Sequence, residues 1–416
     1  MGGIWAAKAL ASHPVDVLLI DRNNYHTFLA LLYQVAAAEL EPENIVYPIR
    51  DILRKIPNVS FLMAKVGTVD FAEKIVSTDC QDVPYDFLIL AAGSESHFFG
   101  VPGTKEYAFP LKSMDEGIAL RNHILTLFER AAYEPDERRR RRALTVVVVG
   151  GGATGVEFSG ALAELVYGLL RKDYPKLACC EAKVIMLEAA DTVLAALPEK
   201  CRTYTAEQLK KVGVDVHFKS VVSKVTKDSV HLKDGTVIPT ETVVWTAGVR
   251  GNSMVWNMKL YTTHDSRVYI LPTLQVPQYP EVYVAGDMAY LEEDGRPLPM
   301  VAQVALQQGT LAAQNIMRQI NGQPLLPFKY RDLGSMATIG RHSAVARLNS
   351  NTFTGFFAWI LWLIVHLVRL IGFRNRLLVL INWTWNYFLY ERTVRLILPS
   401  EESAICKKTM PVSAER

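Results

Sequence analysis

A glycine-rich turn is the clearest candidate for chemistry in this sequence. Residues TVVVV (145–149) suit a buried parallel strand, and they run directly into GGGATG (150–155) and then an apolar helical pattern. This is a G-x-G-x-x-G motif in strand–turn–helix context, which places the pyrophosphate of a dinucleotide at a helix N-terminus. Gly150 permits the tight turn, Gly152 the approach of the phosphates, and Gly155 close packing of helix on strand. The alternative is a glycine-rich turn without a ligand.

An acidic residue ends the next predicted strand. The segment AKVIMLEAAD (182–191) contains Glu188 near its end. A carboxylate at this position accepts hydrogen bonds from the hydroxyls of an adenosine ribose. It also repels a 2′-phosphate, so Glu188 favours NADH over NADPH. The sequence therefore predicts an NADH site.

The beginning of the sequence repeats the second half of this pattern. Gly2 and Gly3 open an apolar helix, and VDVLLIDRNNYH (15–26) then reads as a strand that ends at Asp21. The first strand and the first two glycines of the motif are absent. Gly3 corresponds to the last glycine, and Asp21 to the ribose carboxylate. We therefore expect a second dinucleotide site that is truncated or begins late.

Three further predicted strands end in a glycine beside a small or acidic residue. These pairs are Ala92-Gly93, Ala247-Gly248 and Gly286-Asp287. A nucleotide crosses the carboxyl ends of the strands in such folds, glycine allows its close approach, and Asp287 can accept from a polyol hydroxyl. A simple strand-end turn remains the alternative at Gly286. The predicted fold class is α/β, with two Rossmann-like dinucleotide-binding domains, the second inserted in the first.

These motifs, in this order, resemble the two-domain flavin reductases of the glutathione-reductase-like fold. The stretch AQVALQQGTLAAQNI (302–316) is similar to the AQxAxQQG motif of type II NADH dehydrogenases, single-subunit NADH:quinone oxidoreductases that do not pump protons. RDLGSMATIGRHSAVA (331–346) resembles the segment before that family's membrane-binding tail. The resemblance covers nearly the whole chain. The departure is the missing amino-terminal strand and G-x-G, which the family uses to bind FAD.

The resemblance implies two cofactors. FAD would lie along the first unit, with its phosphates at Gly2 and Gly3, its ribose at Asp21, and its ribityl chain or pyrophosphate at Asp287. NADH would bind the second unit. Hydride transfer needs stacked rings and exclusion of water rather than an acid–base pair, because the cofactors carry the chemistry. This fits a sequence in which we find no catalytic triad.

Two glutamines and one glutamate are the candidate catalytic residues. Gln303 and Gln307 are i, i+4 neighbours, so their amides share a helix face and can donate to a quinone or to flavin carbonyls. Packing of the helix is their alternative role. The helix start at Ala302 would place its positive end near the flavin N1–O2 edge. Glu157 matches a family glutamate linked to the nicotinamide and quinone region; its alternative role is that of a helix-dipole partner.

The tail changes character. Residues 353–373 are mostly apolar or aromatic, and residues 377–398 mix such side chains with charges. A spanning helix needs ~20 apolar residues, so we expect a monotopic helical hairpin in the membrane surface, with a core helix, a dimer seam or one true span as alternatives. Interfacial aromatic and basic side chains support it: Trp359, Trp362, Trp383, Trp385, Tyr387, Tyr390, Arg369, Arg374, Arg376, Arg392 and Arg395.

The predicted domains are a first part of the FAD-binding domain (1–112), an NADH-binding domain (113–252), a second FAD-binding part (253–330) and a membrane-associating region (331–416). We expect a peripheral protein on the cytoplasmic face of a bacterial inner membrane or an equivalent organelle membrane. Its partners would be NADH, a membrane quinone and the bilayer surface, and a homodimer is compatible with the family.

Composition excludes several other classes of protein. A net charge of +3 is too small to indicate nucleic-acid binding, and ERRRRRAL (137–144) reads as an exposed linker. The five cysteines, Cys80, Cys179, Cys180, Cys201 and Cys406, form no CxxC or zinc-binding spacing, so we expect no metal and no redox disulfide. Two other functions stay open: a sulfide:quinone reductase, which needs a cysteine pair, and an NADH-binding membrane protein whose truncated first unit binds flavin poorly or not at all.

Overall fold

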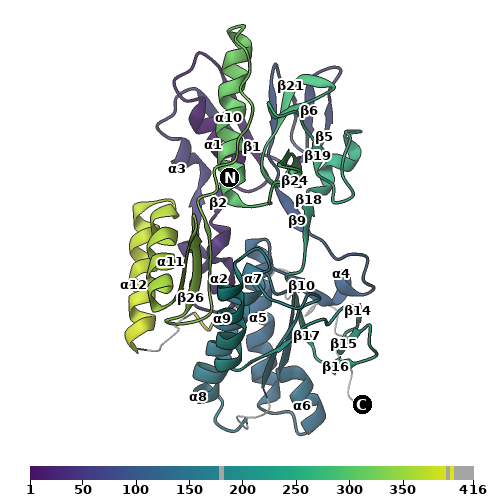
Figure 1. Cartoon of the computed structure of the whole chain (residues 1–416), viewed down its shortest axis with the longest axis vertical. Coiled ribbons are helices and arrows are strands. Elements are labelled where there is room, and N and C mark those ends of the chain that lie inside the picture. The colour runs from purple at the N-terminus through teal and green to yellow at the C-terminus, as the bar shows by residue number, and fades with distance from the viewer. Residues whose placement is uncertain (178–181, 390–393, 398–416) are drawn as a thin grey trace, which may run out of the picture. The chain divides into compact units, whose positions relative to one another are not determined.

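The computed structural model describes residues 1–177, 182–389 and 394–397. The chain forms two compact units. Unit 1 comprises Met1–His26, Val46–His97 and Gly248–Gly334, and unit 2 comprises Thr27–Ile45, Phe98–Ala247 and Ser335–Arg416. The long central segment of unit 2 is inserted between two segments of unit 1 (Figure 1).

Unit 2 is built on a five-stranded parallel sheet. Its strand order is β10 (Ala108–Pro110), β17 (Thr242–Trp245), β11 (Thr145–Val149), β12 (Lys183–Leu187) and β13 (Val214–His217). All five residues of β11 are buried, as expected for a central strand of a sheet covered on both faces. Parallel strands end at the same edge of a sheet, so the segments that follow β11, β12 and β17 meet there.

Helices and a second small sheet complete the central part of unit 2. The main helices are α5 (Met114–Ala131), α7 (Ala153–Glu164) and α9 (Glu199–Lys211). Helix α5 begins with a capping box, in which the Ser113 side chain and the Glu116 side chain each bond the other's backbone N–H. The antiparallel strands β14 (Val222–Val225), β15 (Ser229–Leu232) and β16 (Val237–Pro239) form the small sheet.

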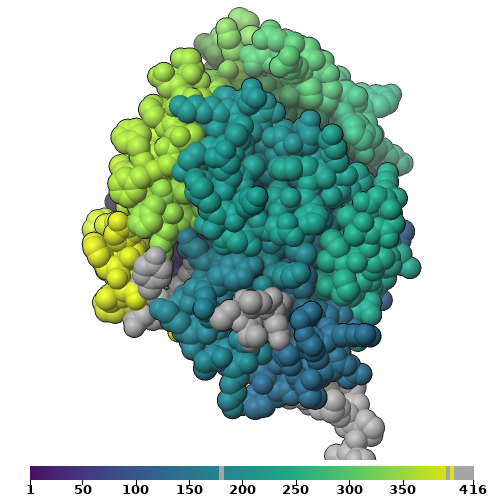
Figure 2. Space-filling view, turned by 60° about the horizontal axis from the view of Figure 1, so that its bottom comes forward, coloured from purple at the N-terminus to yellow at the C-terminus, as the bar shows by residue number. Residues whose placement is uncertain are grey.

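The C-terminal part of unit 2 combines a three-stranded antiparallel sheet with a helical hairpin. The strands are β25 (Ser335–Thr338), β26 (Ala344–Leu348) and β27 (Asn351–Gly355), followed by α11 (Phe356–Arg369) and α12 (Phe373–Leu389). Helix α11 packs on β26 and β27 (Figure 1), and Figure 2 shows the yellow-green and yellow C-terminal residues at the molecular surface. Within the described ranges, no helix combines the length and the apolar character that crossing a bilayer requires.

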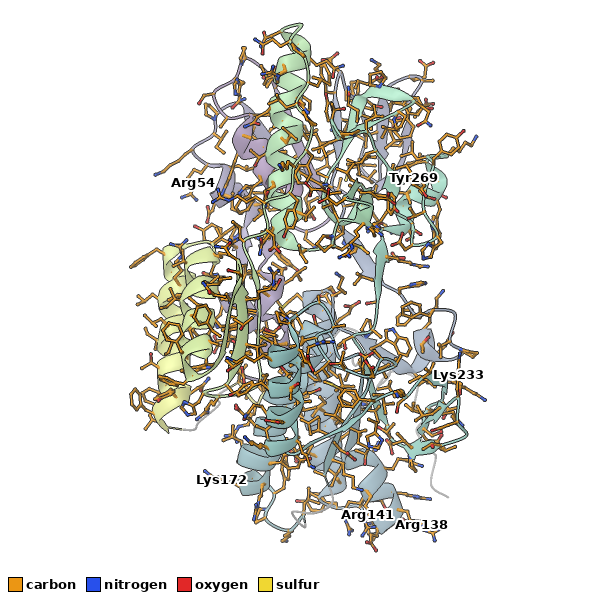
Figure 3. All side chains as sticks on the ribbon, viewed as in Figure 1. Arg54, Arg138, Arg141, Lys172, Lys233 and Tyr269 are labelled. Carbon is orange, nitrogen blue, oxygen red and sulfur yellow. The ribbon has the colours of Figure 1, made fainter. Side chains whose placement is uncertain are left out.

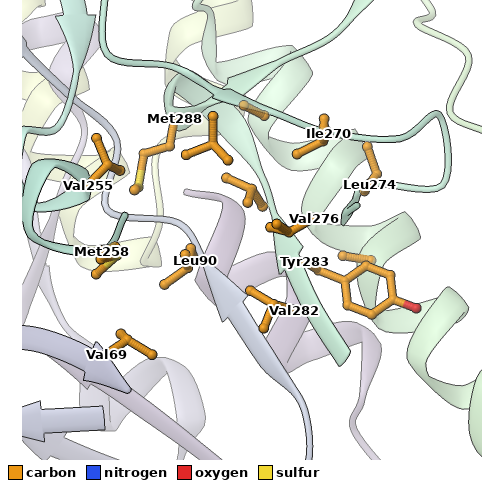
Figure 4. Close-up of a cluster of buried hydrophobic side chains, with 14 of the residues drawn as sticks. Val69, Leu90, Val255, Met258, Ile270, Leu274, Val276, Val282, Tyr283 and Met288 are labelled. Carbon is orange, nitrogen blue, oxygen red and sulfur yellow. The ribbon is translucent and has the colours of Figure 1, made fainter. Parts of the chain in front are cut away.

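Short parallel strand pairs form the framework of unit 1. β1 (Val17–Asp21) pairs with β4 (Val59–Met63), and β8 (Leu88–Leu90) pairs with β21 (Tyr279–Val284). Strand β20 (Gln275–Val276) runs antiparallel to β21. The side chains around β8 and β21 form a buried apolar cluster that fixes both strands (Figure 4); among its members are Val69, Leu90, Val255, Met258, Val282, Tyr283 and Met288.

The other described elements are short. The α-helices are α1 (Gly2–Ala9), α2 (Leu32–Ala36), α3 (Ile49–Leu53), α4 (Thr104–Tyr107), α6 (Glu137–Leu144), α8 (Arg171–Asp173) and the longer α10 (Ala302–Ile320). The 3-10 helices are η1 (Leu29–Leu31), η2 (Pro42–Asn44), η4 (Ser253–Asn257) and η5 (Gly286–Met288), and η3 (Leu165–Leu170) is a π-helix. The strands are β2 (Tyr25–Thr27), β3 (Val46–Pro48), β5 (Val66–Asp70), β6 (Ile75–Thr78), β7 (Asp82–Pro84), β9 (Ser94–Ser96), β18 (Val249–Gly251), β19 (Val268–Tyr269), β22 (Ala289–Tyr290), β23 (Glu292–Glu293) and β24 (Arg296–Pro297).

The arginine-rich segment is a helix rather than the linker that the sequence suggested. In α6 the Asp136 side chain caps the N-terminus by accepting from two backbone N–H groups, and Arg141 pairs with Glu137 one turn earlier. Arg138 and Arg141 extend away from the ribbon (Figure 3), so the expected exposure is confirmed. Local capping and i, i+4 pairing stabilise this helix without much burial.

Helices α1 and α10 of unit 1 pack closely because glycine occupies the contact. A methyl group on Gly309 would lie 2.2 Å from the carbonyl oxygen of Gly2. A methyl group on Gly2 would lie 3.3 Å from the carbonyl oxygen of Ala305. The contact therefore leaves no space for a side chain at Gly309, and it fixes where α1 begins.

We expect Gly309→Ala to destabilise unit 1 by about 1–3 kcal/mol, the usual cost of overpacking. The measurement is the melting temperature by circular dichroism. Gly168→Ala is the control, because Gly168 also lies in a helical segment and an added methyl group there meets nothing within 4 Å. Equal melting temperatures for Gly309→Ala and the unchanged protein would contradict the close approach of the two helices.

Candidate functional site

The glycine-rich turn of unit 2 has the geometry of a dinucleotide cradle. Gly150 has a φ of +109°, and a methyl group on it would lie 2.8 Å from the backbone nitrogen of Ala247. A methyl group on Gly155 would lie 1.9 Å from the carbonyl oxygen of Gly150. Gly152, at the N-cap of α7, has open space where its side chain would be. Two glycines thus allow the turn to pack, whereas the third leaves room beside a helix N-terminus.

Glu188 lies at the same edge of the parallel sheet, directly after β12. Its Oε2 accepts a hydrogen bond from the backbone N–H of Gly151 at 2.5 Å, and its Oε1 accepts from Ala190 at 2.7 Å. The carboxylate is therefore held against the glycine-rich turn while its side chain stays half-buried. A carboxylate oxygen can accept more than one hydrogen bond, so Glu188 keeps capacity for ribose hydroxyls.

In unit 1, the first turn of α1 meets the carboxyl ends of β8 and β21. A methyl group on Gly2 would lie 3.5 Å from the Cβ of Ala285 and 3.6 Å from the Cβ of Ala91. A methyl group on Gly3 would lie 3.5 Å from the Cδ1 atom of Leu19, so Gly3 is less tightly packed than Gly2. Asp21 ends β1, and its Oδ1 accepts from the backbone N–H of Asn23 at 2.9 Å. Burial raises the pKa of Asp21.

The remaining predicted strand ends of unit 1 also adopt glycine-specific conformations. Gly93, Gly248 and Gly286 have φ values of +75°, +74° and +78°. A methyl group on Gly93 meets nothing within 4 Å, so its surroundings are open. The backbone N–H of Ala92 donates to the sulfur of Met288 at 3.0 Å.

Asp287 and Gly286 are held by side chains from other elements of unit 1. The Ser94 hydroxyl donates to the Asp287 carboxylate. The backbone N–H of Gly286 donates to Oε1 of Gln308 at 2.7 Å, and Gln308 is fully buried. Gln308 thus fixes the turn that presents Asp287, a role that the sequence analysis missed although Gln308 lies inside the quoted motif.

The two glutamines proposed to bind quinone hold a backbone segment. Gln303 Nε2 donates to the Gly334 carbonyl at 2.9 Å, and its Oε1 accepts from the Leu333 N–H at 3.0 Å. Gln307 makes the same paired contact with the backbone of Arg331, at 2.9 and 3.0 Å. Each amide therefore fixes residues 331–334 against α10 and retains one N–H for another acceptor.

The N-terminus of α10 has the geometry expected for an anion-binding helix end. Ala302 is the first helical residue, and the N-cap residue Val301 offers no side-chain hydrogen bond. The first backbone N–H groups of a helix lack intrahelical partners and carry the positive end of its dipole. Val301 and Ala302 are exposed, so this end of the helix is open to a ligand.

Glu157 lies in α7 of unit 2, next to a cavity that is partly open to solvent. The cavity is lined by residues of α2, α7, α11, α12 and the turn after β25. Its lining includes Tyr33, Glu39, Glu157, Glu164, Arg341 and Trp362. Glu157 is 8% exposed. Its Oε1 accepts from the indole N–H of Trp362 at 3.2 Å and from the backbone N–H of Thr338 at 3.4 Å.

Burial makes Glu157 a weak acid. Desolvation raises its pKa from the ordinary value of 4.5 to about 8, although the two hydrogen bonds lower it. The carboxyl group is therefore mostly protonated at pH 7 and can both release and accept a proton near neutral pH. The nearby Tyr33 hydroxyl, fully buried, has its pKa raised by desolvation and then by the Glu157 charge.

The potential metal ligands and the cysteines of the described residues lie apart from one another. No group of three His, Cys, Asp or Glu side chains in the described ranges is arranged to hold a metal ion. Cys80 is exposed and Cys201 is buried, and both are free thiols. Cys179, Cys180 and Cys406 lie outside the described residues, as do Tyr390 and Arg392 of the tail.

Comparison with known families places the chain in a class of flavoproteins. The model of the pyridine nucleotide-disulphide oxidoreductase family matches residues 1–309, and that of the NDH2 C-terminal domain matches residues 333–392. This chain therefore belongs to the pyridine nucleotide-disulphide oxidoreductases. Within them it belongs to the type II NADH:quinone oxidoreductases, as the following relatives show.

The chain is 38% identical to the type II NADH:quinone oxidoreductase Ndh of Mycobacterium tuberculosis, over 97% of this chain and 89% of the relative. It is 30% identical to the mitochondrial internal alternative NAD(P)H-ubiquinone oxidoreductase A1 of Arabidopsis thaliana, over 95% and 85% of the two chains. The family and class of enzyme predicted from the sequence are confirmed.

Solved structures share this fold. The structure of NDH2 from Plasmodium falciparum in complex with NADH superposes with a TM-score of 0.87 at 18% identity, covering 96% of this chain and 98% of that one. The sulfide:quinone oxidoreductase of Aquifex aeolicus superposes with a TM-score of 0.70 at 18% identity, covering 98% and 93%. The predicted α/β fold with a C-terminal helical region is confirmed.

We expect the Glu157 carboxyl group to make unit 2 less stable as pH rises. Its pKa is higher in the folded state than in the unfolded state, so its contribution is fully present below about 4.5 and is lost as pH rises through about 8. Each unit of pKa difference corresponds to about 1.4 kcal/mol. The melting temperature of Glu157→Gln, measured relative to that of the unchanged protein, should therefore rise between pH 5 and pH 9.

Glu207→Gln is the control for this measurement, because Glu207 is an exposed glutamate on α9 of the same unit. Its melting-temperature difference at each pH reports the effect of removing a solvent-exposed carboxyl group. The same pH dependence for Glu157→Gln would show that Glu157 is ionised in the folded protein.

Proposed function

We propose that this chain is an FAD-dependent type II NADH:quinone oxidoreductase whose unit 2 binds NADH and whose unit 1 binds FAD. The observation that carries the proposal is the turn between β11 and α7, where Gly152 leaves open space at a helix N-terminus and Glu188 is held at the same sheet edge. This is the arrangement that binds a dinucleotide pyrophosphate and its adenosine ribose. Ala247 lies against Gly150 and limits the turn on its other side.

The residues of unit 1 fit FAD. The N-terminus of α1 lies beside the carboxyl ends of β8 and β21, where the flavin's phosphates would approach Gly2 and Gly3. Asp21 would accept from the adenosine ribose. Asp287, held by Ser94 and by the Gln308-supported turn, would accept from the ribityl chain or its pyrophosphate.

When bound, FAD accepts a hydride from NADH and passes two electrons to a quinone. The protein has to orient the two rings and exclude water. The open N-terminus of α10 at Ala302 would stabilise negative charge on a flavin edge bound beside it. Ala92-Gly93 and Gly248 provide backbone without bulky side chains along the path of the nucleotides.

Quinone reduction also consumes protons. Gln303 and Gln307 keep residues 331–334 in place, and the second N–H of each amide can donate to a quinone oxygen. Glu157 holds a proton at neutral pH and lines a cavity, so we assign it the role of proton relay. A relay acts best when its pKa lies near the working pH.

The C-terminal hairpin is the proposed membrane-binding element. Along α11 and α12, one face exposes a series of large apolar side chains, which we call the outer face. Its members are Phe356, Phe357, Ile364, Val368, Phe373, Leu377, Leu380, Ile381, Trp385, Phe388 and Leu389. Exposed apolar side chains on a helix, accompanied by exposed arginines such as Arg369 and Arg374, are typical of a monotopic helix in the headgroup region. A lipid-soluble quinone would reach the enzyme there.

The function is tested on the purified chain reconstituted with FAD. We expect a flavin absorption spectrum, bleaching of that spectrum by NADH under anaerobic conditions, and its recovery on addition of a short-chain quinone. A chain that folds but stays colourless with added FAD would favour the NADH-binding protein without redox activity. Consumption of NADH only with sulfide or disulfide acceptors would contradict the quinone assignment.

Gly152→Ala separates nucleotide binding from folding. A methyl group on Gly152 meets nothing within 4 Å in the protein, so the melting temperature should not fall, whereas the pyrophosphate of NADH would meet the methyl group. We expect the Kd for NADH, measured by isothermal titration calorimetry, to rise at least about tenfold, which is about 1.4 kcal/mol. Gly168→Ala should leave the Kd unchanged. An unchanged Kd for Gly152→Ala would place NADH elsewhere.

Membrane binding is tested with the double variant Phe373→Asp/Phe388→Asp. These side chains are 81% and 73% exposed on the outer face. Burial of each is worth about 1.5–3 kcal/mol, so binding to anionic liposomes in a sedimentation assay should fall by more than about tenfold. Tyr133→Asp is the matched control, because Tyr133 is 88% exposed in unit 2 but lies outside the hairpin. Equal binding by both variants would mean that the outer face does not contact lipid.

A further inference from the structure

The hairpin that carries the outer face also sends one side chain inward to Glu157. Trp362 of α11 is 1% exposed, and its indole N–H donates to Glu157 Oε1 at 3.2 Å. The partners are separated by 205 residues in the sequence. The proposed membrane-binding element therefore contacts the buried carboxyl group directly.

Neighbouring rings hold the Trp362 indole in place. The His366 ring stacks on it with a centroid distance of 4.0 Å and an interplanar angle of 23°. Tyr33 contacts it edge-on at 6.3 Å, and Trp383 lies at 5.8 Å. The His366 Nδ1 atom lies 2.8 Å from the Trp362 carbonyl oxygen. A ring restrained on several sides keeps its N–H directed at one acceptor.

We propose that Trp362 is a positioning residue for Glu157: its N–H fixes the carboxyl group beside the cavity and determines which oxygen carries the exchangeable proton. The proposal rests on the relay role proposed above for Glu157. Both described hydrogen bonds fall on Oε1, from Trp362 and from the Thr338 backbone. The proton is therefore held at Oε2.

The contact also adjusts the acidity of the carboxyl group. Desolvation raises the pKa of Glu157, and the hydrogen bond from Trp362 opposes that rise because it stabilises the carboxylate. Removal of the N–H should move the pKa further upward. The relay would then release its proton less readily at neutral pH.

The other titratable groups around the cavity come from each element packed against Glu157. Those that line the cavity are Tyr33 of α2, Glu39 after α2, Glu164 of α7, Arg341 after β25 and Tyr387 of the hairpin. His366 of the hairpin stacks on Trp362. The backbone N–H of Arg341 bonds Glu164, and its guanidinium lies 3.9 Å from the same carboxylate. Burial lowers the pKa of His366 to about 4, so this ring is neutral where Glu157 titrates. The Trp362 N–H is thus the side-chain donor to Glu157 in the described structure.

The test compares Trp362→Phe with Trp383→Phe. Both remove an indole N–H from the hairpin, but the Trp383 N–H donates to Gln34 Oε1 at 2.9 Å and not to Glu157. The protonation of Glu157 is followed in the full-length FAD-loaded protein by the infrared C=O band of the protonated carboxyl group, identified by its loss in Glu157→Gln. The pH dependence of flavin reoxidation by a short-chain quinone is the second readout.

We expect Trp362→Phe to raise the infrared midpoint by about one to two pH units, since a hydrogen bond that stabilises the carboxylate is lost. The midpoint in Trp383→Phe should match that of the unchanged protein. The reoxidation profile should shift with the infrared midpoint. Replacement of Trp362 by 3-benzothienylalanine, which keeps the ring shape without the N–H, provides the same test if Trp362→Phe does not fold.

Two results would distinguish failure of the positioning role of Trp362 from failure of the relay role of Glu157. An infrared midpoint that is unchanged in both Trp362 substitutions, or that moves equally in Trp383→Phe, would overturn the positioning role of Trp362. An infrared midpoint that rises as expected, with an unchanged reoxidation profile, would support the positioning of the carboxyl group and would overturn the relay role of Glu157.

Discussion

A carboxyl group removed from water connects the parts of unit 2. Burial of Glu157 in α7 costs free energy unless donors are supplied, and the donors come from β25 and α11, far along the chain. The same helix begins at the glycine-rich turn, and Gly155 in its first turn leaves the space that lets the helix pack closely on that turn. One helix therefore combines the N-terminus proposed to bind a dinucleotide with a buried carboxyl group, and the C-terminal sheet and hairpin supply the donors to that group.

The parallel sheet supplies the other constraint, because it places the ends of sequence-distant strands at one edge. β11, β12 and β17 deliver the glycine turn, Glu188 and Ala247 to that edge. Within unit 1, β8 and β21 deliver Ala91 and Ala285 to the start of α1 in the same way. In both units the positions proposed to face a nucleotide are small residues or carboxylates, while the strands themselves are fixed by apolar packing.

The features that the sequence predicted are those set by local pattern. The strand–turn–helix at 145–165, the acidic strand ends at Asp21 and Glu188, and the two tail helices follow from hydrophobic period and glycine placement, so they could be read from a few neighbouring residues. The α6 helix was taken for a linker because its stability comes from the Asp136 cap and charge pairing rather than from an apolar face. The Gln303 and Gln307 contacts with residues 331–334 were not predictable, because the partners are backbone atoms about 24 to 31 residues away whose position depends on the fold.

Trp362 shows the same limit most clearly. Nothing in an apolar run distinguishes a tryptophan that faces outward from one that donates to a buried acid, since both positions read as hydrophobic. The hairpin consequently carries two kinds of requirement on its two sides. Positions such as Phe373 and Leu380 require only a large apolar side chain, so exchange among leucine, isoleucine and phenylalanine should be tolerated there over evolutionary time. The indole N–H groups of Trp362 and Trp383 each donate to one particular side-chain oxygen, so substitutions at these two positions should be rare even though both lie in the same hairpin.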